Sequence, residues 1–160
     1  MGYTTNFRGS LSVSNLTEEQ RAYINNFAET RRMHRDCNHL MEKYNGKHGH
    51  PTPESNTPEG IYGKDGEFFA GIDDSCYIDY NHSKNQPGLW CQWVINENNE
   101  LEWDGGEKFY NYVEWLQFLI DNFFSKWGCV LNGKIKYRGE DYSDRGYIEV
   151  IDNNVTRYEQ

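Results

Sequence analysis

The chain has 160 residues, enough to bury one hydrophobic core and too few to expect two independent domains. Its 25 acidic side chains against 16 Lys and Arg give a net charge of -9, which argues against a protein that binds nucleic acid through a broad basic face. The sequence contains no secretion signal and no run near the ~20 apolar residues that span a bilayer, so we expect a cytoplasmic protein without membrane contact.

The first predicted element is a strand over residues 3–13, where polar and apolar residues alternate. A helix follows it, because Thr17 and Gln20 match the capping-box pattern that starts a helix. Four apolar residues at helical spacing then form one stripe, which predicts the buried side of this helix. They are Tyr23, Ile24, Phe27 and Ala28.

Residues 45–60 are rich in Gly, Pro, His, Asn and Thr, which indicates a long surface insertion. Short strands are expected after this insertion, and the last two are joined by a hairpin turn at residues 96–99. The expected strands cover residues 67–70, 76–80, 89–95 and 101–103.

The second helix is predicted to begin at Asp104, which can cap it while Glu107 reaches back three residues later. Gly105 and Gly106 would then occupy its first two positions, although a Gly inside a helix costs about 1 kcal/mol. Free N–H groups at a helix start can bind an anion, so the glycine pair is a candidate ligand seat. A plainer interpretation is a tight turn with close packing, and Asp104 would repel an anion.

Apolar residues at helical spacing continue the second helix from Phe109 to Trp127, and Gly128 can end it in a left-handed conformation. Two further strands are expected over residues 130–137 and 147–151, before a final turn.

The order of these elements predicts an α+β fold. We expect a two-layer sandwich in which two main helices cover one face of an antiparallel sheet, an arrangement that is ferredoxin-like in general character. We also expect a single domain over residues 1–160, with the insertion near residues 45–60 on its surface.

Several short segments, distributed over most of the chain, resemble those of a known protein family. They are Gly-Tyr-Thr-Thr at 2–5, Glu-Thr-Arg-Arg-Met at 29–33, Gln-Pro-Gly-Leu-Trp-Cys-Gln-Trp at 86–93, residues 103–110, and Gly-Glu-Asp at 139–141 with Gly146. Together they resemble a family of small uncharacterised proteins encoded by bacteriophages and prophages, and more loosely an actinobacterial family that opens with Met-Gly-Tyr. The resemblance implies an accessory product in the bacterial cytoplasm, and such products often disable a host component by binding it.

Three arginines, Arg31, Arg32 and Arg35, lie at the end of the first predicted helix. Arg31 and Arg35 are one helical turn apart and so share a side. Guanidinium groups bind phosphate and carboxylate in bidentate geometry, so these residues are candidates for anion recognition. The alternative is that they pair with neighbouring acids such as Glu29 and Asp36 on a solvated surface.

Several tryptophans and one glutamine occur in the strands that are expected before the second helix. Trp90 and Gln92 are expected to share a strand face opposite Trp93. If one face is core, the other can stack on a nucleobase or bind a partner protein. The alternative is that all three indoles, including that of Trp103, pack in the core.

No arrangement typical of catalysis or metal binding is present. His34, Cys37 and His39 are possible zinc ligands, but their spacing matches no standard zinc motif. Acidic pairs at 73–74 and 140–141 are not accompanied by a nucleophile motif or a phosphate-binding loop, and turns explain them. We therefore expect no catalytic residue, no metal and no cofactor.

The leading hypothesis is a non-enzymatic phage-type accessory protein that binds and inhibits a bacterial host factor, such as a defence protein. A second hypothesis is sequestration of a phosphate-bearing nucleotide signal, and a third is a small enzyme that acts on such a nucleotide. The ligand-binding residues expected under these hypotheses are Arg31, Arg32, Arg35, Trp90, Gln92, Asp104, Gly105, Gly106, Glu107, Lys108 and Tyr110.

Overall fold

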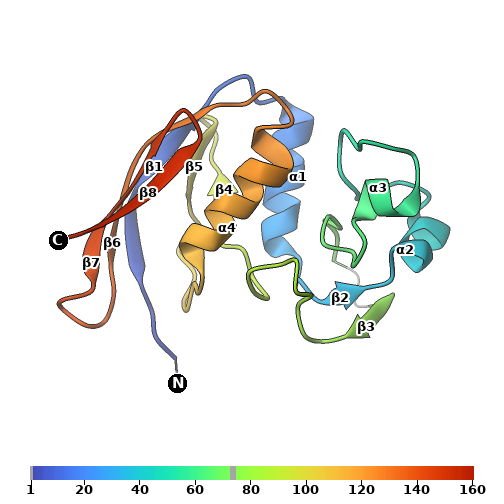
Figure 1. Cartoon of the computed structure of the whole chain (residues 1–160), viewed down its shortest axis with the longest axis horizontal. Helices are drawn as coiled ribbons and strands as arrows, with labels where there is room; N and C mark the ends of the chain where they lie inside the picture. Colours follow the sequence, from blue (N-terminus) through green and yellow to red (C-terminus); the bar gives the residue numbers. More distant parts are fainter. Residues whose placement is uncertain (1, 73–74) are drawn as a thin grey trace. The chain divides into compact units, whose positions relative to one another are not determined.

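Strand β1 (Asn6–Val13) lies inside a six-stranded antiparallel sheet and has a partner strand on each edge (Figure 1). The computed structural model describes residues 2–72 and 75–160. In these ranges the strand order is β4-β5-β1-β6-β7-β8, and four α-helices complete an α+β fold, as predicted. The other strands of the sheet are β4 (Trp93–Ile95), β5 (Glu100–Trp103), β6 (Leu131–Arg138), β7 (Arg145–Ile151) and β8 (Asn154–Glu159).

The chain divides into two compact units. The sheet unit consists of the residues up to 16 and of residues 92–160, and it holds the six-stranded sheet and helix α4 (Tyr112–Leu119). The inserted unit consists of Thr17–Cys91. This division does not test the prediction of a single domain over residues 1–160.

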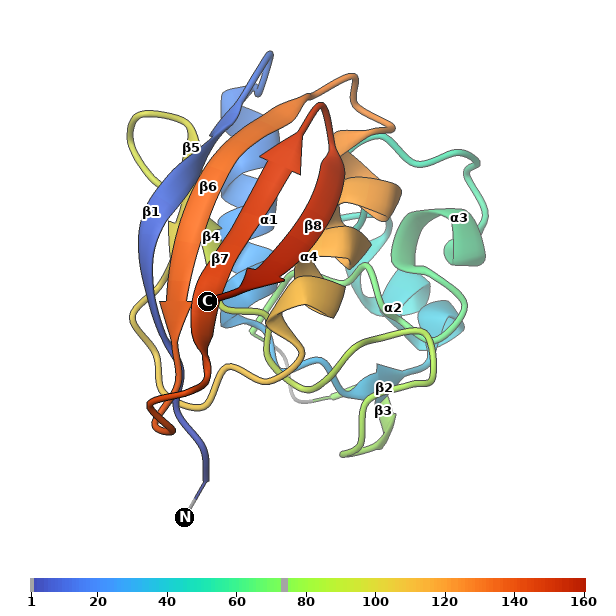
Figure 2. The same ribbon diagram turned by 60° about the vertical axis from the view of Figure 1, so that its left-hand side comes forward.

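The register between β1 and β6 places Phe7 opposite Tyr137 and Arg8 opposite Lys136. Because successive side chains of a strand point to opposite faces, each of these pairs occupies its own face of the sheet. We call the face that carries Phe7 the inner face. Helix α4 lies on this side of the sheet, as Figure 2 shows, and its Tyr112 contacts the ring of Phe7.

Phe7 is the centre of an aromatic cluster on the inner face. Its ring centroid lies 4.9 Å from that of Tyr112 and 5.2 Å from that of Trp93, and two further rings surround it. The indole Nε1 of Trp93 donates a hydrogen bond of 2.8 Å to the carbonyl oxygen of Tyr112, which ties β4 to the first turn of α4. The two further rings are those of Trp103 and Phe109.

Most of the strands of the sheet unit agree with the sequence patterns. The predicted hairpin joins β4 to β5, and β6 and β7 lie close to their expected ranges. Strand β8 was not predicted, because its residues are almost all exposed and show no apolar alternation. Strand β4 begins only at Trp93, so the prediction that Trp90 and Gln92 share a strand face is wrong.

The second helix does not begin at Asp104 as predicted. Helix α4 starts at Tyr112, after Asn111 in a left-handed conformation (φ 57°). Residues 104–110 form a loop because Asp104 Oδ1 accepts a 2.7 Å hydrogen bond from the N–H of Gly106, which makes a local turn in place of a helix cap. Gly105, with φ +86°, allows this turn.

The end of the second helix was predicted better than its start. After Leu119 the helix widens into a π-helical turn, η1 (Ile120–Phe124), which keeps Phe123 and Phe124 buried. Gly128 has φ +75°, which confirms the predicted left-handed end.

In the inserted unit the predicted capping box is confirmed. The N–H of Gln20 donates to Thr17 Oγ1 (3.1 Å), and the N–H of Thr17 donates to Gln20 Oε1 (3.0 Å). The stripe that follows is buried as expected. The helices and strands of this unit are α1 (Glu18–Glu29), β2 (His34–Arg35), α2 (Cys37–Tyr44), α3 (Pro58–Tyr62) and β3 (Tyr77–Asp79).

Two segments of the inserted unit differ from the sequence patterns. Residues 67–70 do not form the predicted strand. Residues 67 and 68 lie in a turn, and the N–H of Phe69 donates to the carbonyl of Gly66 (3.1 Å) and not to a neighbouring strand. The segment 45–60 contains a buried histidine, His50, and the first residues of α3. Part of this segment is therefore packed, although it was expected to be a surface insertion.

Two predicted anion-binding arginines are buried in the inserted unit. Arg32 is 0 % exposed and Arg35 is 1 % exposed. The guanidinium of Arg32 lies 3.9 Å from the ring centroid of Phe27, and its Nη2 donates to the carbonyl oxygen of Phe69. Burial lowers the pKa of Arg32 to about 9, so the group still carries its charge at neutral pH. The prediction that these two arginines lie on the surface is therefore wrong. Backbone carbonyls and aromatic rings of the inserted unit surround both guanidinium groups.

We expect the Arg32→Ala substitution to lower the free energy of unfolding by about 3 kcal/mol, because it leaves a cavity beside Phe27 and an unpaired carbonyl on Phe69. Urea unfolding measures this loss. The exposed Arg8→Ala is the matched control and should change stability by less than about 0.5 kcal/mol. Equal and small effects of both substitutions would contradict a structural role for Arg32.

The aromatic cluster gives a second expectation. Phe7→Ala should destabilise the protein by about 3 kcal/mol, because the ring contacts four others. Phe7→Leu should cost clearly less, since it keeps most of the apolar volume. Unfolding followed by tryptophan fluorescence reports on both variants, and an unchanged transition in Phe7→Ala would show that the cluster does not stabilise the sheet unit.

Candidate functional site

The residues predicted to bind a ligand are divided between the two units. The arginines and Trp90 belong to the inserted unit, whereas Gln92 and residues 104–110 belong to the sheet unit. Arg32 and Arg35 are buried. Of the ligand-binding residues predicted in the inserted unit, Arg31 and Trp90 reach its surface. Trp90 is 44 % exposed, and Nη2 of Arg31 donates to the carbonyl oxygen of Tyr80 at 3.4 Å.

The loop at residues 104–110 is closed by its own hydrogen bonds. The N–H of Gly106, which was expected to be free for an anion, donates to Asp104. The amide Nε2 of Gln92 donates to the carbonyl oxygen of Glu107 (2.8 Å), and its Oε1 accepts from the indole of Trp103 (3.2 Å). Partial burial raises the pKa of Asp104. The predicted seat at a helix start is therefore absent from this loop.

Lys108 and Tyr110, at the far end of the same loop, have exposed side chains. The hydroxyl of Tyr110 accepts a 3.1 Å hydrogen bond from the backbone N–H of Tyr3, which connects the loop to the residues before β1. Binding by the loop residues stays a prediction.

The acidic residues after β6 serve the turn that joins β6 to β7, as expected. Asp141 Oδ1 accepts hydrogen bonds from Ser143, and Asp144 Oδ2 accepts a 2.8 Å bond from the hydroxyl of Tyr3. Asp73 and Asp74 lie outside the described residues. Within residues 2–72 and 75–160, no three His, Cys, Asp or Glu side chains are grouped as a metal site would require.

A different set of residues forms the most distinctive surface of the sheet unit. On β6 the side chains of Lys134, Lys136 and Arg138 are exposed, whereas Ile135 and Tyr137 between them are buried. This alternation places the three cations on the outer face of the sheet, opposite the aromatic cluster.

Cations of the two adjacent strands extend this group. Arg8 of β1 lies directly opposite Lys136, and Arg145 of β7 lies directly opposite Arg138. Paired residues of neighbouring strands are about 5 Å apart, so these side chains are close neighbours. We call the five exposed cations the basic face; they are Arg8, Lys134, Lys136, Arg138 and Arg145.

The cations of the basic face are not held in ion pairs with described residues. In the part of the chain that the structure describes, none of its five cations forms an ion pair. Glu149 stands opposite Lys134 in the β6–β7 register, but the two do not form an ion pair. The face is therefore a local positive surface on a chain whose net charge is -9.

Tyrosine rings accompany these cations. The ammonium of Lys134 lies 4.3 Å from the ring centroid of Tyr147, and the guanidinium of Arg145 lies 4.5 Å from that of Tyr142. Tyr147 also stacks on Tyr158 of β8, with ring centroids 4.8 Å apart and ring planes 25° apart. The rings attract these cations modestly and do not neutralise their charge.

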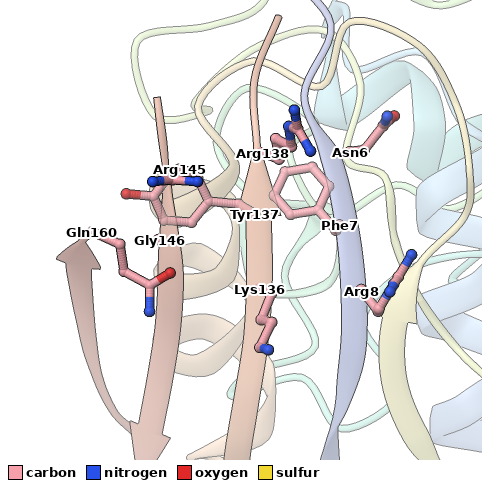
Figure 3. A pocket seen from close by; sticks show the side chains of 9 residues that line it. All are labelled: Asn6, Phe7, Arg8, Lys136, Tyr137, Arg138, Arg145, Gly146 and Gln160. Carbon is pink, nitrogen blue, oxygen red and sulfur yellow. The ribbon is translucent and has the colours of Figure 1, made fainter. Parts of the chain in front are cut away.

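The end of the basic face nearest the β6–β7 turn is hollowed. The hollow has a volume of about 530 Å³. Figure 3 shows the side chains around it, with Arg8 and Lys136 on adjacent strands. Its polar lining comes from Asn6, Arg8, Lys136, Arg138, Arg145 and Gln160.

The sequence contained part of the signal for this face. Lys134 and Lys136 alternate with apolar residues in a stretch that was predicted to be a strand, so their common face could have been noted. The contribution of Arg8 could not, because it depends on the pairing of β1 with β6 across more than 120 positions of the sequence.

Comparisons with protein-family models, with curated proteins and with solved structures found no match. None of the described helices has the length and apolar character to cross a membrane. The candidate site is therefore identified by its geometry, which is a sheet face with five cations that form no ion pair within the described residues and with tyrosine rings beside them.

Proposed function

We propose that the protein is a non-enzymatic accessory protein of the phage or prophage type that binds a phosphate-bearing nucleotide on its basic face. The observation that supports this most strongly is the gathering of five cations, none of which forms an ion pair within the described residues. In this proposal the site consists of residues other than the arginines of the inserted unit.

Phosphate fits the chemistry of this face. Arg138 and Arg145 are directly opposite each other and can bind phosphate oxygens in bidentate geometry, while Lys136 adds a compact charge beside them. Like charges on opposite residues of neighbouring strands repel each other. A bound anion would reduce this repulsion, so the loss of repulsion would add to the free energy of binding.

The tyrosines fit the other part of a nucleotide. A nucleobase can stack on an aromatic ring whatever its identity. Tyr158 is 40 % exposed and lies next to Tyr147, which is directly opposite Lys136. A nucleotide whose base stacks on Tyr158 would thus have its phosphate near the cations.

We expect nucleoside di- and triphosphates or cyclic dinucleotides to raise the melting temperature, because a ligand at 100 times its Kd adds about 2.7 kcal/mol to stability. The Lys136→Gln/Arg138→Gln variant should lose this gain. Lys47→Gln/Lys84→Gln removes the same charge from exposed sites of the inserted unit and should keep it. A thermal-shift screen measures the effect, and no stabilisation by any nucleotide would refute the proposal.

A second candidate function is the binding of a bacterial host protein through the inserted unit. The exposed residues of β3 and its flank favour it, because Tyr and Arg are enriched in protein interfaces. Ile78 is 57 % exposed, and the rings of Tyr77 and Tyr80 lie 4.5 Å apart with Arg31 over Tyr80.

This second candidate predicts a stoichiometric partner in a pull-down from bacterial lysate. The partner should be lost with Ile78→Asp and retained with Lys136→Gln/Arg138→Gln. Recovery of no such partner, or a partner that both variants retain, would count against an interface at β3.

A further inference from the structure

We infer that the preferred ligand of the basic face is a single strand of nucleic acid several nucleotides long, of which a lone nucleotide would fill only a part of the site. This inference rests on the proposed function, because it uses the same cations and the same tyrosines. It concerns the size and the strandedness of the ligand.

The cations of the basic face are spread too widely for one phosphate group to contact all of them. Side chains two positions apart on a strand are separated by about 6.6–6.8 Å, so Lys134 and Arg138 of β6 lie roughly 13 Å apart. From Arg8 to Arg145 the face crosses three adjacent strands, which adds roughly 10 Å in the other direction. A chain that carries one phosphate per nucleotide can neutralise cations spread in this way.

The cations are arranged in rows that continue into the tyrosines. One row runs across four strands in direct register, from Arg8 through Lys136 and Tyr147 to Tyr158. A neighbouring row contains Arg138 and Arg145. Backbone contacts on one side and a stacking surface on the other are the features with which proteins bind single strands without strong sequence preference.

The form of the face favours unpaired bases. Figure 2 shows β1, β6, β7 and β8 side by side, with α4 on the other side of the sheet. The outer face therefore presents strands, and in the described residues no helix of the sheet unit lies on it that could enter a duplex groove. Rings such as Tyr158 can stack only on bases that are not already stacked within a duplex.

The overall acidity limits this binding to the basic face. A chain of net charge -9 repels nucleic acid from the rest of its surface, so binding depends on the five local cations. For single strands the logarithm of the binding constant falls with the logarithm of salt concentration with a slope of about -0.7 per phosphate neutralised. Five cations predict a slope of about -3.5.

The test is fluorescence anisotropy with labelled 15-nucleotide probes of oligo-dT and oligo-U, with a duplex of the same length, and with ATP as competitor. We expect a single strand to bind with a salt slope of about -3.5 and at least tenfold more tightly than the duplex. The Lys136→Gln/Arg138→Gln variant should reduce the slope to about -2.1, because two phosphate contacts are lost. Tyr158→Ala should weaken binding without a change in slope.

Several results would overturn the inference. If ATP stabilises the protein but neither single strand binds more tightly than ATP, the inference fails and the proposed function stands. If neither ATP nor an oligonucleotide binds, both fail. Equal affinity for the duplex would refute the single-strand assignment, and an equal loss with Lys47→Gln/Lys84→Gln would show that only net charge matters. The two labelled probes distinguish DNA from RNA as the source of the strand.

Discussion

The pairing of β1 with β6 is the constraint on which the sheet unit depends. It joins the beginning of the chain to residues 131–138 and places Phe7 opposite Tyr137 and Arg8 opposite Lys136. Since the side-chain period of a strand is two residues, a slip of one position would bury the cations and expose the rings. The burial of the aromatic cluster therefore selects this register, and the register in turn gathers the cations on the other face.

The basic face has a cost in the unbound protein. Arg138 and Arg145 are directly opposite each other, and so are Arg8 and Lys136, so like charges repel across neighbouring strands. Contacts with the rings of Tyr142 and Tyr147 offset part of this repulsion. A polyanionic ligand would offset the rest, which is why the arrangement is easier to understand as a binding surface than as a stabilising one.

The two groups of cations show why a site is hard to recognise from local sequence. Arg31, Arg32 and Arg35 are adjacent in sequence and suggested an anion site, yet Arg32 and Arg35 are buried against Phe27 and Phe69. The basic face is assembled from β6 and β7, which follow each other in sequence, and from β1, which lies far from both. Local spacing cannot show whether an arginine faces solvent or a ring inside the core, because that depends on which segments pack around it.

The sequence by itself determined the elements whose signals are local. The capping box at Thr17, the hairpin turn at 96–99, the left-handed end at Gly128 and the α+β class all follow from neighbouring residues. Tertiary structure alone decided the position of β8, the start of α4 at Tyr112 and the gathering of the basic face. The physical reason is that β8 and the basic face depend on strand pairing, which has no short-range signature in the chain. The start of α4 depends on whether Asp104 accepts the N–H of Gly106 in a turn or caps a helix, and the same residues are compatible with both.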